Sequence, residues 1–270
     1  MDKLLYVENL SVGYDGKYVV DDINFSLEKD SIQAILCPNN GGKSSIIKTL
    51  SGVIPHNCGK IYVNKIPLNK RNFKKYIKSI GVVFDDIEHQ FLQKRVIDEL
   101  RFPLVNLCYS KKDINLVVDK ISNILLINNI LNNDISSLSN YEKIKVLIAT
   151  SIVNSPKILF LDDIFKYLSK KEKTEMFKIL NAIISELHIS ILFTTSMIDD
   201  IVDLDNIIVV TDNKIVLNGS FKEIILQDNE LTKYGFKIPI MIDLSRKLQF
   251  YNLIEDIYYD VDKVVDTLWK

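Results

Sequence analysis

The sequence is poor in cysteine and carries almost no net charge. Its 270 residues include three cysteines, Cys37, Cys58 and Cys108, with no Cys-x-x-Cys spacing. Neither a disulfide framework nor a structural zinc site is therefore expected, and a reducing compartment fits this cysteine usage best. Lys and Arg number 34 against 35 Asp and Glu, which gives a net charge of −1. This balance argues against a protein that binds nucleic acid through a basic face.

Long apolar stretches are also missing. No run approaches the roughly 18 to 20 residues that a membrane-spanning helix requires. The first residues, MDKLLYVENL, lack the basic and apolar regions of a secretory signal, so we expect any membrane association to go through a partner. With 47% hydrophobic and 26% charged residues, the composition is that of a folded globular chain and excludes bulk disorder. The length suggests roughly two domains, or one large domain with an appendage.

Short apolar runs alternate with helical patterns along most of the chain, which predicts a parallel or mixed α/β sheet. The runs KILFL and ISILFT are apolar almost throughout, as expected for strands that are covered on both faces. Strands are predicted at 4–10, 24–27, 33–36, 60–63, 79–84, 157–161, 189–194, 206–210 and 214–217. Helices are predicted at 43–50, 110–126, 140–154, 170–187 and 221–227. Residues 88–135 show helical spacing instead of strand alternation, which indicates a helical insertion, and the tail after about residue 228 reads as a small helical appendage.

The most informative stretch is IQAILCPNNGGKSSIIKTL at 32–50. An apolar strand runs through a glycine-containing turn and Gly42-Lys43-Ser44 into a helix. In such a turn, backbone N–H groups and the helix dipole form a nest for phosphate, Lys43 supplies a full charge, and the Ser44 hydroxyl can bind Mg²⁺. The full pattern has glycine at position 37, where this chain has Cys37, and its Cβ favours a looser or displaced loop. Asn40 occupies a position that we expect to have positive φ.

Two residues of this stretch have competing interpretations. Lys43 could be a solvated lysine at a helix start, but a cation there opposes the helix dipole unless an anion is bound. Cys37 could be a reactive thiol, although a buried, inert one is the favoured interpretation.

A second candidate site lies in KILFLDD at 157–163. Four apolar residues end in Asp162 and Asp163 at the end of a predicted strand. The first acid can hold Mg²⁺ through water and the next can polarise an attacking water. The alternative is a simple strand-to-loop cap, which the upstream phosphate loop makes less favoured.

The order of these motifs resembles a known family. The phosphate loop is followed by VVFDDIEHQF at 82–91, LSNYEKIKVLIATSIVNSPKILFLDD at 138–163, ILFTTS at 191–196 and NKIVLNGS at 213–220. Over essentially the whole chain this order resembles the ATPase subunits of ABC transporters, and more narrowly the energy-coupling factor ATPases that drive vitamin and metal-ion importers. The resemblance implies an α/β, P-loop NTPase (ABC ATPase) core with a β-subdomain, a helical insertion and a small C-terminal helical appendage.

The resemblance also implies a division of the chain into four parts. Residues 1–87 are the first part of the nucleotide-binding core, and 88–154 are a helical subdomain that ends in the signature region. Residues 155–228 are the second part of the core, and 229–270 are an appendage that helps to pair two ATPases.

Several positions match the family's nucleotide-binding residues, which implies ATP and Mg²⁺ as cofactors. Tyr14 matches the aromatic residue that stacks on adenine. The phosphate-loop matches are Asn39, Asn40, Gly41, Gly42, Lys43, Ser44 and Ser45. Asp162 matches the acid that acts with Ser44 on Mg²⁺.

The family's hydrolytic residues are changed in this chain. The loop glutamine is Asp85, the catalytic glutamate is the shorter Asp163, and the switch histidine is Thr195. The signature Leu-Ser-Gly-Gly-Gln reads Leu138, Ser139, Asn140, Tyr141 and Glu142. Losing one preorganised donor costs about 10²–10³ in rate, so we predict impaired hydrolysis at this subunit's own site. Tyr141 is expected to add bulk to the site that the signature completes on a partner.

Two functional hypotheses follow from the resemblance. In the first, the chain is the ATP-hydrolysing engine of an importer. In the second, it binds ATP, hydrolyses it weakly and pairs with a more complete paralogue. A decaying copy ranks below both.

The resemblance also implies partners: a second ATPase subunit in a homo- or heterodimer, a transmembrane coupling subunit and a substrate-binding membrane subunit. These partners would place the chain at the cytoplasmic face of the cell membrane. Asp85 is as readily a solvated turn residue as one that reaches the site, where it would bind Mg²⁺ or repel ATP. Asp199-Asp200 is expected to be a solvated turn.

Overall fold

Two β-sheets organise the chain in the computed structural model, which describes residues 3–14, 16–259 and 261–269. The first sheet is antiparallel, with strand order β2-β1-β4-β5. Its strands are β1 (Lys3–Tyr14), β2 (Lys17–Glu28), β4 (Cys58–Val63) and β5 (Ile66–Pro67). The second sheet has the order β10-β9-β3-β8-β7-β6, and all of its neighbouring strands are parallel except β9 and β10. Its strands are β3 (Ile32–Leu36), β6 (Ile80–Val83), β7 (Ile158–Asp162), β8 (Ser190–Thr195), β9 (Ile207–Thr211) and β10 (Lys214–Gly219).

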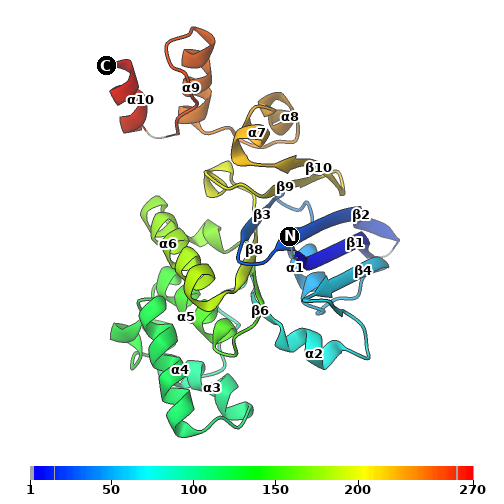
Figure 1. Cartoon of the computed structure of the whole chain (residues 1–270), viewed down its shortest axis with the longest axis vertical. Helices are drawn as coiled ribbons and strands as arrows, with labels where there is room; N and C mark the ends of the chain where they lie inside the picture. The colour runs from blue at the N-terminus through cyan, green and yellow to red at the C-terminus, as the bar shows by residue number, and fades with distance from the viewer. Residues whose placement is uncertain (1–2, 15, 260, 270) are drawn as a thin grey trace.

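The helices fall into three groups along the chain. Two belong to the first half of the core, α1 (Lys43–Leu50) and α2 (Phe73–Lys78). The middle group is α3 (Val96–Asn106), α4 (Lys111–Ile124), α5 (Asn140–Ile152) and α6 (Lys170–Leu187). The last group is α7 (Phe221–Ile225), α8 (Asp228–Lys233), α9 (Ile240–Phe250) and α10 (Val261–Leu268). In Figure 1 the middle group forms a lobe on the side of the central sheet away from β1, β2 and β4, and the last group extends beyond β10.

Two hydrophobic clusters hold these layers together. Ile46, Ile47 and Leu50 of α1 pack in one cluster with residues of both sheets, such as Leu10 of β1 and Phe160 of β7. Helix α1 therefore lies between the two sheets and fixes the position of the loop that precedes it. The other cluster joins the opposite face of the parallel strands to α3, α4, α5 and α6. Both faces of β7 and β8 are thus covered, which explains why their sequences lack alternation.

Most of the predicted elements are confirmed. The α/β core is present, and the helices predicted at 43–50, 110–126, 140–154, 170–187 and 221–227 correspond to α1, α4, α5, α6 and α7. The strands of the second sheet also lie close to their predicted ranges. Helices α2 and α3 were not predicted as separate elements, and α3 contains Pro103, a residue that ordinarily breaks a helix because it lacks an N–H and crowds the preceding turn.

The first two strands are longer than their predicted ranges of 4–10 and 24–27. They form one hairpin that continues to Tyr14 and resumes at Lys17. The register between them shifts at several points, and Asn9 and Asp22 have positive φ. Each shift interrupts the alternation of buried and exposed side chains, so the period-two pattern covers only part of each strand.

No helix within residues 3–14, 16–259 and 261–269 is long and apolar enough to cross a membrane. The longest one, α6, has 18 residues, and it buries only part of its surface, through side chains such as Met176, Ile179, Leu180 and Ile183.

Candidate nucleotide-binding site

The carboxyl ends of four parallel strands bring the predicted site residues to one edge of the central sheet. Leu36 at the end of β3 pairs with Thr195 at the end of β8, and Thr194 pairs with Asp162 at the end of β7. Strand β6 lies next to β7 and leads into Asp85. Ligands of open α/β sheets bind at this edge, so the fold places the phosphate loop and the acidic residues where the sequence analysis expected them.

Cys37 closes the phosphate loop. Its backbone N–H donates to the carbonyl of Thr195 at 2.9 Å, and its thiol donates to the carbonyl of Gly41 at 3.0 Å. The side chain is buried, and burial raises its pKa to about 11. A Cβ added to Gly41 would lie 2.6 Å from the Cys37 sulfur, so the cysteine fits because position 41 is glycine. The expected burial of the thiol is confirmed, and a looser or displaced loop stays a prediction.

Two further loop residues adopt the left-handed conformation. Asn40 has φ 63°, as predicted, and Gly42 has φ 100°. A Cβ on Gly42 would lie 2.8 Å from a methyl carbon of Val19 in β2. Glycine at position 42 thus allows both the turn and the close approach of the β1–β2 hairpin.

Lys43 lies inside the loop and not in solvent. Its ammonium donates to Asn39 Oδ1 at 3.1 Å and to the Cys37 carbonyl at 3.4 Å, and it lies 3.7 Å from Asp163 Oδ2. Only 7% of the side chain is exposed. A buried ammonium held mainly by neutral acceptors favours an anion nearby, so the alternative of a solvated lysine is wrong.

Asp162 is fully buried and has the features of a Mg²⁺ ligand. Its Oδ1 accepts a hydrogen bond from the Thr194 hydroxyl at 2.9 Å, and the same hydroxyl accepts the Asp163 backbone N–H at 3.0 Å. Oδ2 has no hydrogen-bond partner among the described residues. Burial raises the pKa of Asp162, while the neighbouring Ser44 hydroxyl lowers it. An unpartnered carboxylate oxygen beside a serine hydroxyl fits the hard oxygen ligands that Mg²⁺ requires.

Those oxygens do not complete a metal site by themselves. No group of three or more His, Cys, Asp or Glu side chains in the described part of the chain could hold a metal ion. Mg²⁺ commonly binds through one or two protein oxygens together with substrate phosphates. The residues therefore fit a metal that arrives with a nucleotide.

Asp163 lies between two lysines. It is the residue before the short 3₁₀ helix η3 (Ile164–Tyr167), and its backbone is left-handed with φ 50°. Its Oδ2 lies 3.7 Å from the ammonium of Lys43 and 3.8 Å from that of Lys166. Burial raises the pKa of Asp163, and the two lysines oppose that shift.

Asp85 reaches the same cluster. Its Oδ2 lies 3.6 Å from the Lys166 ammonium, and its backbone carbonyl accepts the Tyr167 hydroxyl at 2.7 Å. The loop that carries Asp85 is held by Gln90, whose side chain accepts the Phe84 N–H and donates to the carbonyls of Phe84 and Asp86. Asp85 is therefore close enough to affect a bound nucleotide, and not only a solvated turn residue.

Thr195 is turned away from this cluster. Its buried hydroxyl donates to Asp200 Oδ2 at 2.5 Å and accepts the Met197 N–H at 3.1 Å. The Asp200 carboxylate is fully buried, and its Oδ1 lies 2.6 Å from the ammonium of Lys173 in α6. The expectation that Asp200 lies in a solvated turn is wrong, because the Lys173 charge and the Thr195 hydroxyl compensate its burial.

The predicted signature lies at the start of α5. Ser139 caps this helix in a capping box, in which its hydroxyl accepts the Glu142 N–H and donates to the Glu142 carboxylate. The Tyr141 ring lies under the Lys145 ammonium, 4.8 Å from ring centroid to nitrogen. Burial first, and then the charges of Glu175 and Glu172 in α6, raise the pKa of Tyr141 to about 12. The Tyr141 ring therefore points toward α6 of the same chain. Leu138 and Asn140 flank the serine.

Tyr14 ends β1 with 49% of its surface exposed. It belongs to the hairpin whose Val19 touches the phosphate loop, so its position is compatible with an aromatic surface beside a nucleotide. Ser45 follows Ser44 in the first turn of α1.

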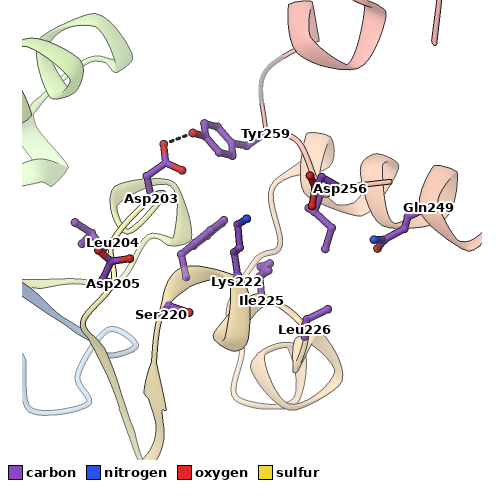
Figure 2. A pocket seen from close by; sticks show the side chains of 12 residues that line it. Asp203, Leu204, Asp205, Ser220, Lys222, Ile225, Leu226, Gln249, Asp256 and Tyr259 are labelled. Atoms are coloured by element: carbon purple, nitrogen blue, oxygen red, sulfur yellow. Dashed lines mark hydrogen bonds between the residues drawn. The ribbon is translucent and has the colours of Figure 1, made fainter. Parts of the chain in front are cut away.

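A cleft lies at another place in the molecule. A cavity of about 480 Å³ separates the end of β10 and α7 from the tail that follows α9. Figure 2 shows Asp203 facing Tyr259 across it, with a hydrogen bond from the tyrosine hydroxyl. None of the predicted nucleotide-site residues lines this cavity.

Comparison with known proteins identifies the family. The family model for ABC transporters matches residues 20–166. An energy-coupling factor transporter ATP-binding protein of Clostridium perfringens is 30% identical over 243 residues, which cover 88% of this chain and 85% of the relative. The chain belongs to the ABC transporter ATPases of the energy-coupling factor type.

Other comparisons agree with this family. An energy-coupling factor transporter ATP-binding protein of Mesomycoplasma hyopneumoniae is 29% identical over 252 residues, covering 93% of this chain and 91% of the relative. Among solved structures, cbiO1 from Clostridium perfringens, part of the ABC transporter complex cbiONQ, has a TM-score of 0.78 and 29% identity. That similarity covers 86% of this chain and 94% of the solved one. The predicted P-loop NTPase fold of the ABC ATPases is thereby confirmed.

The sequence analysis gave no site role to two groups that shape this ABC ATPase site. Lys166 holds both Asp85 and Asp163, and Gln90 fixes the loop around Asp85. The position of Lys166, three residues after Asp163, was a usable signal, because one turn of 3₁₀ helix brings residues i and i+3 together. The bond from Gln90 to Phe84 depends on how the loop folds, which the sequence pattern does not specify.

Proposed function

We propose that this chain is the ATP-binding subunit of an energy-coupling factor importer and that it couples ATP binding and hydrolysis to uptake of a vitamin or a metal ion. The observation that carries the proposal is the buried Lys43 ammonium, which lies inside the phosphate loop next to Asp163. Family membership supplies the transporter context.

The partners in this proposal are a second ATPase subunit, identical or paralogous, a transmembrane coupling subunit and a substrate-binding membrane subunit. The chain would then act at the cytoplasmic face of the cell membrane, held there by its partners. The proposal keeps the four-part division at residues 1–87, 88–154, 155–228 and 229–270, and it involves no nucleic acid.

Each site residue has a physical role in this proposal. The backbone N–H groups from Gly42 to Ser45 receive the phosphates, and Lys43 neutralises part of their charge. Bound Mg²⁺, held by Ser44 and Asp162, would offset negative charge on the phosphate oxygens. Asp163 is the residue placed to accept a proton from the attacking water, and Tyr14 offers its ring to the adenine.

A second candidate function is an ATP-binding half that hydrolyses slowly beside a more complete paralogue. Three features favour slow hydrolysis at this site. The Asp163 carboxylate lies near two ammonium groups, Asp85 pairs with Lys166, and the Thr195 hydroxyl is bound to Asp200. Each feature is a contact within the chain that engages a side chain otherwise available to position the attacking water or to contact the terminal phosphate.

One experiment tests the proposal and separates the two candidates. Binding of Mg·ATP and release of phosphate would be measured on the co-purified membrane complex for the native chain, Lys43→Ala and Asp163→Asn. Loss of ATP binding in Lys43→Ala supports the proposal, and equal binding by native chain and variant contradicts it. Turnover that falls by half or more in Asp163→Asn assigns hydrolysis to this subunit. Unchanged turnover favours the ATP-binding half.

A further inference from the structure

Lys166 in the 3₁₀ helix η3 is a charged group that the proposed mechanism does not use. Its ammonium bridges two carboxylates, with 3.6 Å to Asp85 Oδ2 and 3.8 Å to Asp163 Oδ2. It also lies over the Tyr167 ring, 5.0 Å from the centroid. Asp163 in turn lies 3.7 Å from Lys43. Lys166 is therefore separated from the phosphate-loop lysine by a single carboxylate.

The charge balance of the site depends on this residue. Three carboxylates, Asp85, Asp162 and Asp163, face two ammonium groups, so the local sum is 2 − 3 = −1. Without Lys166 the sum becomes 1 − 3 = −2. Like charges repel more strongly at a partly buried site than in water, so removal of Lys166 makes the approach of a polyanion less favourable.

The segment that carries Lys166 is firmly held. The Tyr167 hydroxyl donates to the Asp85 carbonyl at 2.7 Å. The Phe165 ring stacks on Phe177 with centroids 5.0 Å apart and touches Phe193 at 4.9 Å. The Lys166 side chain itself keeps 38% exposure. A fixed backbone with a partly solvated ammonium lets the charge move toward a bound phosphate while the segment stays in place.

We propose that Lys166 is a second cationic determinant of the nucleotide site, which favours the triphosphate over the diphosphate by offsetting the charge of Asp163 and Asp85. This inference rests on the proposed function, because it requires a nucleotide in the phosphate loop. Lys43 contacts the outer phosphates of a bound nucleotide. Asp163 lies between Lys43 and Lys166. The Lys166 charge thus acts mainly on the terminal phosphate, where ATP and ADP differ.

The test compares binding of two probes, the non-hydrolysable ATP analogue adenylyl imidodiphosphate and ADP, both with Mg²⁺. The variants are Lys166→Met, Lys166→Gln and Lys166→Arg, each in the full chain within its transporter complex. Lys171→Met is the matched control, since Lys171 is exposed in α6 and lies outside the site. Loss of one partly screened charge predicts roughly ten-fold weaker binding of the ATP analogue in Lys166→Met and Lys166→Gln. ADP binding should change much less.

Steady-state kinetics give a second reading. A residue that acts on binding raises the KM for ATP and leaves kcat unchanged or higher, and Lys166→Arg should restore the native KM. Unchanged affinity for the ATP analogue in both neutral variants, or a lower kcat at native KM, overturns the proposal. Equal losses for the analogue and ADP overturn it too.

The Lys43→Ala variant distinguishes failure of the Lys166 proposal from failure of the proposed function. If Lys43→Ala abolishes binding while the Lys166 variants bind normally, only the Lys166 proposal fails. If Lys43→Ala binds normally, the proposed function fails.

Discussion

Cys37 and Gly41 form a matched pair at the scale of single residues. The cysteine thiol fills the space in front of residue 41, and its hydrogen bond to the Gly41 carbonyl replaces the open turn that a glycine at position 37 would allow. The chain therefore tolerates the Cys37 side chain at the start of its phosphate loop because Gly41, which lies against it, has no side chain.

We predict that Gly41→Ala destabilises the native chain by about 1–3 kcal/mol, the usual cost of overpacking. The added Cβ would lie 2.6 Å from the Cys37 sulfur and 3.1 Å from the Pro38 carbonyl oxygen. Denaturant unfolding measures this loss. In the double variant Cys37→Gly with Gly41→Ala, part of the stability should return, because the sulfur contact is gone. Equal losses in the single and double variants would show that the two positions are independent.

The Cys37 thiol should also resist alkylation. At pH 8 a pKa of about 11 leaves roughly one thiolate in a thousand, against about one in ten for an unshifted thiol. Burial slows the reaction further. Iodoacetamide should therefore modify the exposed Cys58 and Cys108 first. Cys37 should react in the folded protein only slowly, and rapidly once the protein is denatured. Mass spectrometry of the digested protein measures this order, and early modification of Cys37 would contradict it.

Between elements, one buried ion pair connects α6 to the end of β8. Lys173 and Asp200 meet at 2.6 Å, and Asp200 also receives the Thr195 hydroxyl. This contact fixes the turn after β8 and with it the direction of the Thr195 side chain.

Lys173→Met should lower the free energy of unfolding by about 3–5 kcal/mol, because it leaves the Asp200 charge buried and unpaired. The double variant Lys173→Met with Asp200→Leu should recover much of that loss. Denaturant unfolding of the two variants provides the measurement, and Lys171→Met on the exposed side of α6 serves as the control. A loss below about 1 kcal/mol in Lys173→Met, typical of a surface pair, would contradict the prediction.

Sequence patterns predicted elements better than they predicted contacts. The uninterrupted apolar runs of β7 and β8 located the acidic residues at the edge of the sheet, and the GKS motif located the loop. The direction of Tyr141 and the burial of Asp200 were not predictable, because both depend on partners from α6 that are distant in the sequence. The β1–β2 hairpin was partly missed, since its bulges shift which side chains face the core.

At the scale of the whole molecule, the tail presents an uncovered apolar surface. Phe250 is 81% exposed, Trp269 79%, and Ile240 84%. Where exposed apolar side chains form a contiguous patch, they mark an interaction surface. In the proposed function this surface contributes to the contact with a second ATPase subunit.

Replacing Phe250 and Ile240 with serine should weaken self-association or pairing by at least about 2 kcal/mol if these side chains anchor the contact. Sedimentation velocity across a concentration series measures the change. Leu126→Ser, at an exposed position beyond α4, is a control of similar chemistry that should leave pairing intact. Pairing that is equally strong in all three proteins would remove the tail from the interface.

The placement of α1 limits how this molecule can change shape. Its apolar side chains are covered by one sheet on each side, so the two sheets cannot slide past each other without exposing them to water. The helices α3 to α5, by contrast, join the core covalently only through the segments at 84–95 and 153–157. The apolar side chains of these helices also pack on the parallel sheet. Any movement of that lobe around a nucleotide is therefore expected to be a small rotation about the two segments that keeps this packing, with Gln90 bracing the first segment.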